Sequence, residues 1–459
     1  MYRDVQIVVK KSDEIYEYFD LIAHKANNLY NASLFRLRQI MTGLNKDSKA
    51  LSDNELEVFR EVDRTVAINT KLSRPTKKNP YVSYQFLYHM MYINENPDYI
   101  CDDLPSQTAQ QVLKVVVQDM KSFLKSKSDY LKNRHKYLGE PKIPKYKNPG
   151  GKYSFKFTNQ QVVIDEDLIS FPKTKIKLDK FSYINKEWKL KEVKIVPVHN
   201  VYVMHMTFDD MLDNRAIKQK HERICAIDLG VNNFVAMTNN FNKPSMLFKG
   251  GRVKSVNHWY NKTIAKLISK QTKGTTNKYV PTTKYKAITL KRNNIMSDFM
   301  HKVARRVVDY CIEENVDTLV VGDNKGWKQE VKLSKVENQK FVQIPFDRFK
   351  NNLEYLCKRE GIELVFTEES YTSKASHLDN DKIPNLNDTA IEFSGVRGPT
   401  KYLGRTNTNG YRGLYMRKTD NTVINSDLNG SANIGRKAFP LYTCSLDTFK
   451  NILVVKDPN

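Results

Sequence analysis

The stretch Ile224–Met237, ICAIDLGVNNFVAM, constrains the fold of this chain more than any other segment. Its first four residues are apolar without a polar break, which is typical of a central strand buried on both faces. The run ends at Asp228. Gly230 and Asn232–Asn233 then turn the chain into a second apolar run, so the segment predicts a tight hairpin. A carboxylate at the end of a buried strand is costly unless it is paired, hydrogen-bonded or bound to a cation.

Asp228 could simply cap its own turn, because Asp side chains often hydrogen-bond the backbone of tight turns. A second acidic residue, Asp427, favours another role, since the sequence Ile424–Phe439 places it at the start of a short helix near the C-terminus. Phosphodiester cleavage by two metal ions requires carboxylates that bridge ions about 3.5–4 Å apart. Two aspartates from distant parts of the chain, brought to one place, would meet part of that requirement.

The charge of the chain indicates a polyanionic partner. Its 459 residues include 75 Lys and Arg against 51 Asp and Glu, a formal net charge of +24. The excess is spread along the chain, and no basic amphipathic helix beside a lipid anchor stands out, so nucleic acid is favoured over a membrane surface. No apolar run is long enough to span a membrane, and the N-terminus lacks a signal-peptide profile. We therefore expect a soluble, cytoplasmic protein that is nucleoid-associated when bound to DNA.

The cysteines do not form a pattern typical of disulfide-rich or zinc-binding proteins. There are five, an odd number, scattered along the chain without a CxxC pair. This argues against a disulfide framework and against a cysteine-rich zinc site.

The N-terminal third is predicted to be mainly helical, with a small β-domain after it. Apolar residues recur at helical spacing in three segments, the third of which follows a clear start signal at Pro105–Ser106. At Pro141 the composition changes and short strand-like runs follow, which predict a small barrel-like β-domain over residues 138–218. The other expected elements are a strand at 3–10 and helices at 14–41, 54–68 and from 106 onward.

Two parts of the sequence supply candidates for nucleic-acid binding. In the segment PKIPKYK, three lysines suit contact with phosphates, and a tyrosine suits stacking on an unpaired base. Two arginines lie off the apolar stripe of a helix predicted over 293–314. A basic helix face is usually only a solvated surface, but the net charge of this chain favours a nucleic-acid surface. The candidates are Lys142, Lys145, Tyr146, Lys147, Arg305 and Arg306.

After the hairpin, strand and helix patterns alternate, which predicts an α/β layer architecture with a mixed sheet. Residues 271–285 are rich in Thr and Lys and are expected to be flexible, whereas 374–422 are rich in Asn, Gly and Arg and show no helix or strand period. A loop that long inside a compact domain is usually functional or disordered. The expected elements are a strand at 245–250, helices at 253–270, 293–314 and 345–360, and buried strands at 316–323 and 362–369.

Several segments together resemble the TnpB family of transposon-encoded RNA-guided nucleases, relatives of the type V CRISPR effectors and of the eukaryotic Fanzor proteins. In the C-terminal half the matching segments are AIDLGVNN, TLVVGDNKGWKQE, EESYTSKAS and INSDLNGSANIGRK. In the N-terminal half they are NNLYNASLFRLRQ, LPSQTAQQVLK and PKIPKYK. The resemblance covers nearly the whole chain, and the ordered set is far more specific than any single motif.

The resemblance implies a multidomain α+β protein with a RuvC nuclease domain of RNase H-like fold, a wedge-type β-barrel and a helical recognition domain. It also implies a guide RNA made from the transposon end and a double-stranded DNA target beside a short motif that the protein reads. The expected domains are the first wedge strand (1–13), the recognition domain (14–137), the wedge barrel (138–218), the RuvC-like domain (219–373), an insert at the zinc-ribbon position (374–422), the RuvC C-terminal helix (423–440) and a tail (441–459).

The sequence departs from the family pattern in two places. Most of the family ends the strand that corresponds to TLVVGD with a glutamate, but here Gly322 and Asp323 stand there. Glu369, in Glu-Ser-Tyr-Thr-Ser, is similar to the relocated glutamate of some TnpB branches and of Fanzor. The insert usually carries a cysteine-coordinated zinc ribbon, whereas residues 374–422 contain no cysteine and one histidine, His377. We therefore expect no structural zinc, and we expect His377 to be a surface residue.

The predicted catalytic and metal-binding residues are Asp228, Glu369 and Asp427, which would hold two Mg²⁺ ions. Glu368 competes with Glu369, because adjacent strand residues face opposite sides. Glu369 is preferred since it keeps the offset of the motif from Thr372. Asp323 is a weaker alternative that could instead cap the turn after it.

Two other functions are compatible with much of the sequence. A family member that has lost cleavage would be an RNA-guided DNA-binding repressor, but such a copy should show substitutions at the triad, and this chain keeps three acidic candidates. A DNA-strand-joining transposase is disfavoured because no tyrosine nucleophile motif with paired histidines is evident. The oligomeric state is left open.

Overall fold

The computed structural model describes residues 2–165, 168–179, 184–185, 187–211, 215–217, 220–274, 278–323, 343–385 and 392–457. The chain forms two compact units, residues 1–212 and 213–459. Both contain helices and sheets, which confirms the multidomain α+β class. The expected boundary at 218 and the loop after Asp323 lie outside the described residues. No helix of the described part is long and apolar enough to cross a membrane.

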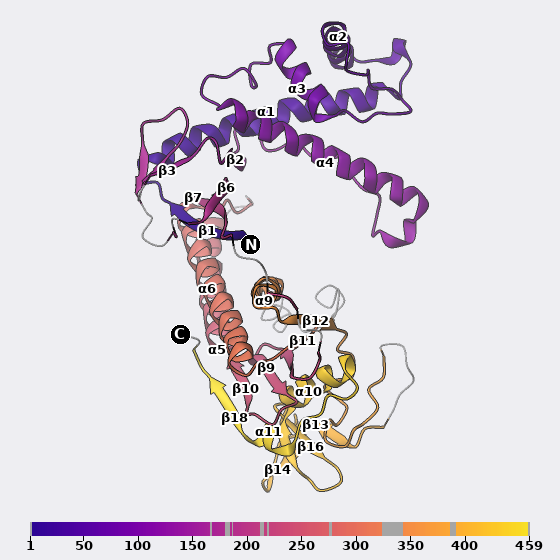
Figure 1. Cartoon of the computed structure of the whole chain (residues 1–459), viewed down its shortest axis with the longest axis vertical. Coiled ribbons are helices and arrows are strands. Elements are labelled where there is room, and N and C mark those ends of the chain that lie inside the picture. The colour runs from indigo at the N-terminus through magenta and orange to yellow at the C-terminus, as the bar shows by residue number, and fades with distance from the viewer. Residues whose placement is uncertain are drawn as a thin grey trace. The chain divides into compact units, whose positions relative to one another are not determined.

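Four helices dominate the first unit (Figure 1). The predicted helices at 14–41 and 54–68 and after Pro105 are confirmed, whereas the sequence reading missed the third helix. The apolar stripe of the first is buried along its whole length, from Ile15 to Ile40, because it packs on the other helices and on the sheet of this unit. The helices are α1 (Ile15–Gly43), α2 (Asp53–Ile68), α3 (Tyr84–Ile93) and α4 (Ser106–Lys132), with short 3₁₀ turns η1 (Ser48–Ala50) and η2 (Arg134–Lys136).

The β-structure of the first unit consists of two sheets. The four-stranded sheet has the order β1-β7-β6-β2, and all its neighbours are antiparallel. The second sheet has the order β3-β4-β5. Within the described residues neither sheet closes on itself, so the barrel expected over 138–218 is not observed. The strands are β1 (Tyr2–Val9), β2 (Phe155–Thr158), β3 (Val163–Asp165), β4 (Leu168–Ser170), β5 (Lys177–Asp179), β6 (Lys189–Val198) and β7 (Val201–Asp209).

A six-stranded mixed sheet is the centre of the second unit, with the order β12-β11-β8-β9-β10-β18. The predicted hairpin is confirmed as β8 and β9, and β11 and β12 run parallel to β8. The edge strand β12 is half-exposed, which corrects the expectation of a third buried strand. The C-terminal strand β18, which pairs with β10, was not predicted. The strands are β8 (Ile224–Leu229), β9 (Asn233–Asn239), β10 (Ser245–Lys249), β11 (Thr318–Gly322), β12 (Glu363–Thr367) and β18 (Ile452–Val455).

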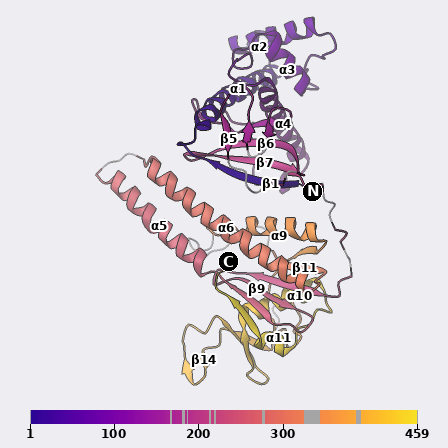
Figure 2. The same cartoon turned by 60° about the vertical axis from the view of Figure 1, so that its left-hand side comes forward.

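Helices cover both faces of this sheet. Alternate residues of β8 bury on opposite sides, with Cys225 and Ile227 against α6 and α9, and with Ile224 and Ala226 against α10 and α11. Figure 2 shows α5 and α6 lying side by side, and α6 begins ten residues before the predicted start because Thr282 caps it. The expected flexible segment 271–285 is therefore partly helical. The helices are α5 (Gly251–Thr272), α6 (Thr283–Glu313), α9 (Phe346–Glu360), α10 (Ser426–Ala438) and α11 (Leu446–Lys450).

The insert after β12 contains short strands that the sequence pattern did not predict. Three of them form an antiparallel sheet of order β13-β16-β17, and two form a separate hairpin. The strands are β13 (Gly395–Arg397), β14 (Lys401–Tyr402), β15 (Arg405–Thr406), β16 (Leu414–Arg417) and β17 (Val423–Asn425). Because β17 leads directly into α10, this sheet fixes the start of the helix that carries Asp427.

Candidate active site

Asp228 lies at the C-terminal end of β8, where helix α10 crosses the sheet. The helix is held there by Ser431, whose hydroxyl donates a hydrogen bond of 2.7 Å to the carbonyl oxygen of Ala226. Gly430 faces the carboxylate so closely that a Cβ atom at this position would lie 2.7 Å from Oδ2 of Asp228. A glycine is required at 430 for this approach of the helix to Asp228.

Asp427 lies in the first turn of α10, whose start is capped by Asn425: its Oδ1 accepts hydrogen bonds from the backbone amides of Asp427 and Leu428. The side-chain amide of Asn233, at the start of β9, donates to Oδ2 of Asp427 over 2.8 Å. Arg397, from β13, approaches Oδ1 of the same carboxylate at 3.4 Å. Two elements from different parts of the chain therefore orient Asp427.

Glu369 follows β12, and its carboxylate lies over the end of the neighbouring strand β11. A Cβ atom on Gly322, the last residue of β11, would be 2.5 Å from Oε2 of Glu369 and 2.7 Å from Cδ1 of Ile434. The carboxylate of Glu369 therefore occupies the space that a side chain at position 322 would need. This contact explains in steric terms why a glutamate after β12 occurs together with a glycine at the end of β11.

The two alternative acidic residues make ion pairs elsewhere. Glu368 pairs with the ammonium group of Lys437 and accepts a hydrogen bond from the backbone amide of Ser370 at 2.6 Å, and these contacts lower its pKa. Asp323 pairs with Lys350 of α9 at 2.9 Å. Neither residue is among the causes that raise the pKa of Asp228, whereas Glu369 and Asp427 are.

The electrostatics of the site centre on Asp228, on which the charges of both Glu369 and Asp427 act. Burial raises the pKa of Asp228 well above its usual range, and the charges of Glu369 and Asp427 raise it further, while Arg397 opposes them. Burial is also the largest cause for Glu369, with Asp323 and Glu368 next, and together they raise the pKa of Glu369 to about 7. A carboxylate whose charged form is disfavoured by burial and by neighbouring carboxylates is stabilised by a cation.

The donor chemistry of these residues suits a hard divalent cation. Carboxylate oxygens are the ligands that Mg²⁺ prefers in proteins, and burial disfavours the charged forms of Asp228 and Glu369, which a cation would favour. In the part of the chain that the structure describes, however, no three Asp, Glu, His or Cys side chains already lie together as a group that could hold a metal ion. The residues thus match such an ion in chemistry, and no preformed ligand cluster is present.

The predicted nucleic-acid residues lie in both units. Lys142, Lys145 and Tyr146 are exposed, but the ammonium group of Lys147 lies over the rings of Tyr30 and Tyr153, 4.5 and 5.0 Å from their centroids. The candidates on α6, Arg305 and Arg306, are also exposed. Arg305 forms an ion pair with Asp309 on the next turn at 2.5 Å.

His377 is buried, which contradicts the expectation of a surface residue. Only 6% of it is exposed, and its Nε2 accepts a hydrogen bond of 3.0 Å from the backbone amide of Cys444. Burial lowers the pKa of His377 to about 3, so the ring is neutral. The prediction failed here because the ring packs against Tyr442 and against Phe449 of α11, a C-terminal helix that was not predicted.

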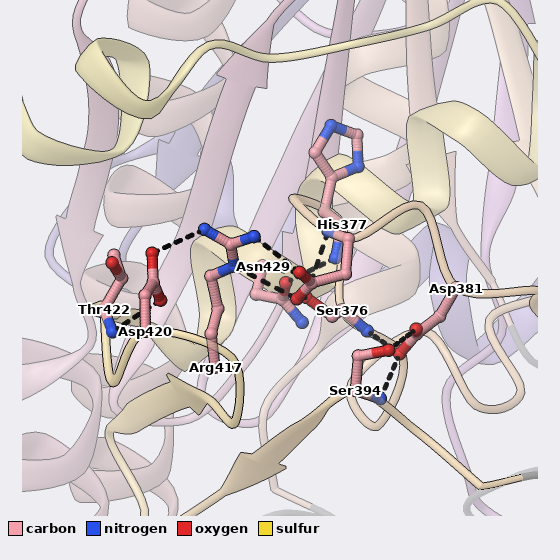
Figure 3. A network of polar contacts seen from close by, with 9 residues as sticks. Ser376, His377, Asp381, Ser394, Arg417, Asp420, Thr422 and Asn429 are labelled. Carbon is pink, nitrogen blue, oxygen red and sulfur yellow. Dashed lines mark hydrogen bonds and ion pairs between the residues drawn. The ribbon is translucent and has the colours of Figure 1, made fainter.

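Figure 3 shows the polar network that surrounds this part of the insert. Arg417 contacts Asp379 through two nitrogens, at 2.5 and 3.0 Å, and also pairs with Asp420. Asp381 accepts hydrogen bonds from both Ser376 and Ser394. Charge-assisted hydrogen bonds of this kind are strong when they are partly buried. They tie the start of the insert to its last strands.

Sequence reasoning missed several residues of the site. Asn233 was read only as part of a turn, although it orients Asp427, and its Oδ1 accepts a hydrogen bond of 2.8 Å from Lys249. Arg397 and Gly430 were not singled out. The signal for Asn233 was present in the sequence, because a polar residue at the start of an otherwise apolar strand needs a buried partner.

Two family models match the C-terminal half of the chain. Residues 211–328 match the OrfB type of the IS605 elements, described as a probable transposase, and residues 346–434 match the Cas12f1-like TNB domain. The resemblance to the TnpB family is thereby confirmed. The two matched ranges contain all three carboxylates, with Asp228 in the first and Glu369 and Asp427 in the second. No curated protein gives a significant match.

Solved structures with some similarity to this TnpB-like chain are RNA-guided effectors. A Cas12f1–sgRNA–target DNA complex is 14% identical, with 96% of this chain and 100% of that chain covered and a TM-score of 0.34. The mini-RNA-guided endonuclease CRISPR-Cas_phi3 is 9% identical, with 95% and 92% covered and a TM-score of 0.45. C2c1 of Alicyclobacillus acidoterrestris with single-guide RNA is 9% identical, with 90% and 70% covered and a TM-score of 0.29. These TM-scores are too low to establish a shared fold.

Proposed function

We propose that this protein is an RNA-guided DNA endonuclease of the TnpB type. Its second unit would be a RuvC-like nuclease domain of RNase H-like fold that cleaves target DNA next to a short motif read by the protein. The observation that supports the proposal is the effect of Glu369 and Asp427, from distant parts of the chain, on Asp228 at the end of β8: their charges add to burial in raising its pKa. Three distant segments, each matching a TnpB motif, supply these three carboxylates.

The three carboxylates would hold two Mg²⁺ ions, which supply an activated water molecule and stabilise the leaving oxygen when they are bound. Asp228 would be the central residue in holding these ions, because the charges of both other carboxylates act on it. Asn233 would keep the carboxylate of Asp427 turned toward the site through its hydrogen bond. Glu369, with a pKa of about 7 in the absence of a cation, would be ionised fully only when the positive charge is present.

The proposed partners are a guide RNA derived from the transposon end and a double-stranded target DNA. The net charge of +24 supports a polyanionic partner. In an RNA-guided enzyme the base pairing between guide and target supplies the sequence specificity, so the protein needs to contact mainly the backbone. The exposed lysines of the first unit and the basic face of α6 are the surfaces that we assign to this role.

Cleavage assays on single variants, with guide RNA and Mg²⁺, test the catalytic assignment. Asp228→Ala, Glu369→Ala and Asp427→Ala should each abolish cleavage and leave guide and target binding nearly intact, because pairing and backbone contacts carry the affinity. Glu368→Ala and Asp323→Ala are matched controls that remove neighbouring carboxylates with other partners, and both should keep most of the activity.

Two results would change the conclusion in different ways. An active Glu369→Ala variant beside an inactive Glu368→Ala or Asp323→Ala variant would refute the assignment of the glutamate and leave the family unaffected. If the unmodified protein binds its target and never cuts it, the function is that of an RNA-guided repressor.

A further inference from the structure

A cavity of about 430 Å³ lies in the first unit between α1, α4 and the segment that follows α4. Its size is within the range of sites that bind small molecules and cofactors. Tyr30 and Asp119 lie among its inner walls, together with the buried ring of Phe123. The exposed residues Lys142 and Lys145 are part of the same lining.

The outer wall of this cavity is fixed to α1 by side-chain hydrogen bonds. Asn31 binds both backbone groups of Lys147: its amide donates to the carbonyl oxygen at 3.0 Å, and its Oδ1 accepts from the backbone amide at 2.8 Å. The buried Asn27 donates to the carbonyl oxygen of Asn148 at 3.0 Å. Because the ammonium group of Lys147 is also held between two tyrosine rings, this wall is in place before any ligand arrives.

The inside of the cavity offers a charged acceptor rather than a site for an anion. The hydroxyl of Tyr30 donates to Oδ2 of Asp119 at 2.7 Å. Among the residues that the structure describes, no donor reaches the other oxygen, Oδ1. A phosphate inside the cavity would be repelled by this carboxylate, whereas a group with N–H donors would satisfy it.

The rim of the cavity has the opposite character. Tyr146 is 43% exposed, and the guanidinium group of Arg38 lies 4.7 Å from the centroid of its ring. Together with Lys142 and Lys145, this ring gives the rim cations and an aromatic face, which suit a phosphodiester backbone and a stacked base. A ligand with a donor-bearing heterocycle at one end and a phosphate at the other therefore matches the cavity at both ends.

We propose that this cavity takes one unpaired nucleotide of a bound RNA, with its base inside and its phosphates at the rim. The proposal rests on the RNA partner of the proposed function. RNA is favoured over DNA because the hydroxyls of Ser122 and Ser126 line the same cavity. A ribose 2′-hydroxyl, which is both donor and acceptor, can pair with such groups.

The carboxylate of Asp119 makes this pocket selective between the two pyrimidines. Cytosine presents an amino group that donates to a carboxylate, whereas uracil presents a carbonyl oxygen at the same position and can donate only from its ring N–H, between two carbonyl oxygens that repel the carboxylate. A hydrogen bond to a charged group differs enough in free energy to give roughly ten-fold tighter binding of cytosine. Asp119→Asn should remove this preference, because an amide can donate to the uracil oxygen as well as accept from cytosine.

The test uses the full-length protein after bound RNA has been removed at high salt, with eight-nucleotide oligo(rC) and oligo(rU) as fluorescence-anisotropy probes. The unmodified protein should prefer oligo(rC) by roughly ten-fold, and Asp119→Asn should bind both alike. Asp129→Asn is the matched control, since Asp129 lies on the same helix and accepts a hydrogen bond from Tyr137, outside the cavity. Tyr146→Ala should weaken both probes by roughly ten-fold, and Tyr146→Phe should retain binding.

Three outcomes would overturn the proposal, and they are distinguishable. If Asp119→Asn keeps the preference of the unmodified protein, or if there is no preference, the base does not enter the pocket, while salt-sensitive RNA binding would still support the proposed function. If oligo(dC) binds as tightly as oligo(rC) with the same dependence on Asp119, the occupant is a DNA strand. If neither RNA binds to the unmodified protein, both the pocket and the proposed RNA partner are wrong.

Discussion

A methyl group added to Gly322 should separate the activity of this protein from its stability. The Cβ atom of Gly322→Ala would lie 2.5 Å from Oε2 of Glu369, whereas ordinary contacts begin at 3.4 Å. The carboxylate must therefore move by about 0.9 Å, the difference between these two distances. The other close atom is the terminal Cδ1 of Ile434, so both neighbours are the ends of flexible side chains.

The cost in folding free energy should be modest, because flexible side-chain ends can shift without moving the backbone. Adding one methyl group to a packed site typically costs about 1–3 kcal/mol, and we expect a value near the lower end. The cost in activity should be larger. A displacement of about 1 Å of a catalytic group can reduce the rate by roughly 10²-fold, and the carboxylate of Glu369 is the group displaced here.

Two measurements on the purified Gly322→Ala variant check this. Urea unfolding gives the change in free energy of unfolding, and a guide-dependent cleavage assay gives the change in rate. Gly251→Ala is the control, because a Cβ atom at Gly251 meets nothing within 4 Å. A Gly322→Ala variant with unchanged cleavage would refute the steric argument. A variant that loses stability by much more than about 3 kcal/mol would show that position 322 is a structural site, not only a catalytic one.

Three further predictions concern the stability, the bound RNA and the metal content of the purified protein. In metal-free protein the pKa of Glu369 is about 7 against an ordinary 4.5, so the folded state holds a proton that the unfolded chain releases. The free energy of unfolding should therefore fall by about 3 kcal/mol as the pH rises from 4.5 to 7, and Glu369→Gln should flatten this dependence in thermal unfolding. The protein should purify with RNA, whose affinity falls roughly 10³–10⁵-fold between about 50 and 200 mM salt if 6–10 phosphates are contacted; binding without salt dependence would argue against this. Elemental analysis should find no stoichiometric zinc, and one tightly bound zinc per chain would show that the insert was misread.

The central sheet of the second unit could be predicted from sequence because its signals are local. The apolar run before Asp228 and the turn residues after it specify the hairpin without reference to the rest of the chain. The parallel strands follow from apolar runs separated by periodic helices, and α9 ends at Glu360, as its pattern predicts, where Gly361 adopts the left-handed conformation. These elements could be predicted because their buried residues form apolar runs or a helical period that can be recognised in the sequence itself.

The elements that were missed depend on pairing between distant segments. The strand β18 has two exposed residues out of four and is held by its parallel pairing with β10, so its own sequence carries little signal. The strands of the insert are two to four residues long, shorter than any periodicity can reveal. His377 was misplaced for the same reason, since the residues that contact its ring, Tyr442, Cys444 and Phe449, lie more than sixty residues away in the C-terminal segment.

The relocated glutamate shows where sequence comparison needs the structure. The sequence alone shows a glycine where a glutamate is expected and a glutamate in a later segment, as two separate facts. The structure relates the two residues directly, because the carboxylate of Glu369 fills the volume that a side chain at Gly322 would occupy. A side chain at 322 would have to displace the carboxylate of Glu369 and, whatever stands at 369, the end of Ile434. The two positions are therefore coupled. Gly322→Glu alone should abolish cleavage, and the double variant Gly322→Glu with Glu369→Ala should cleave, because its glutamate at 322 no longer meets the carboxylate of Glu369.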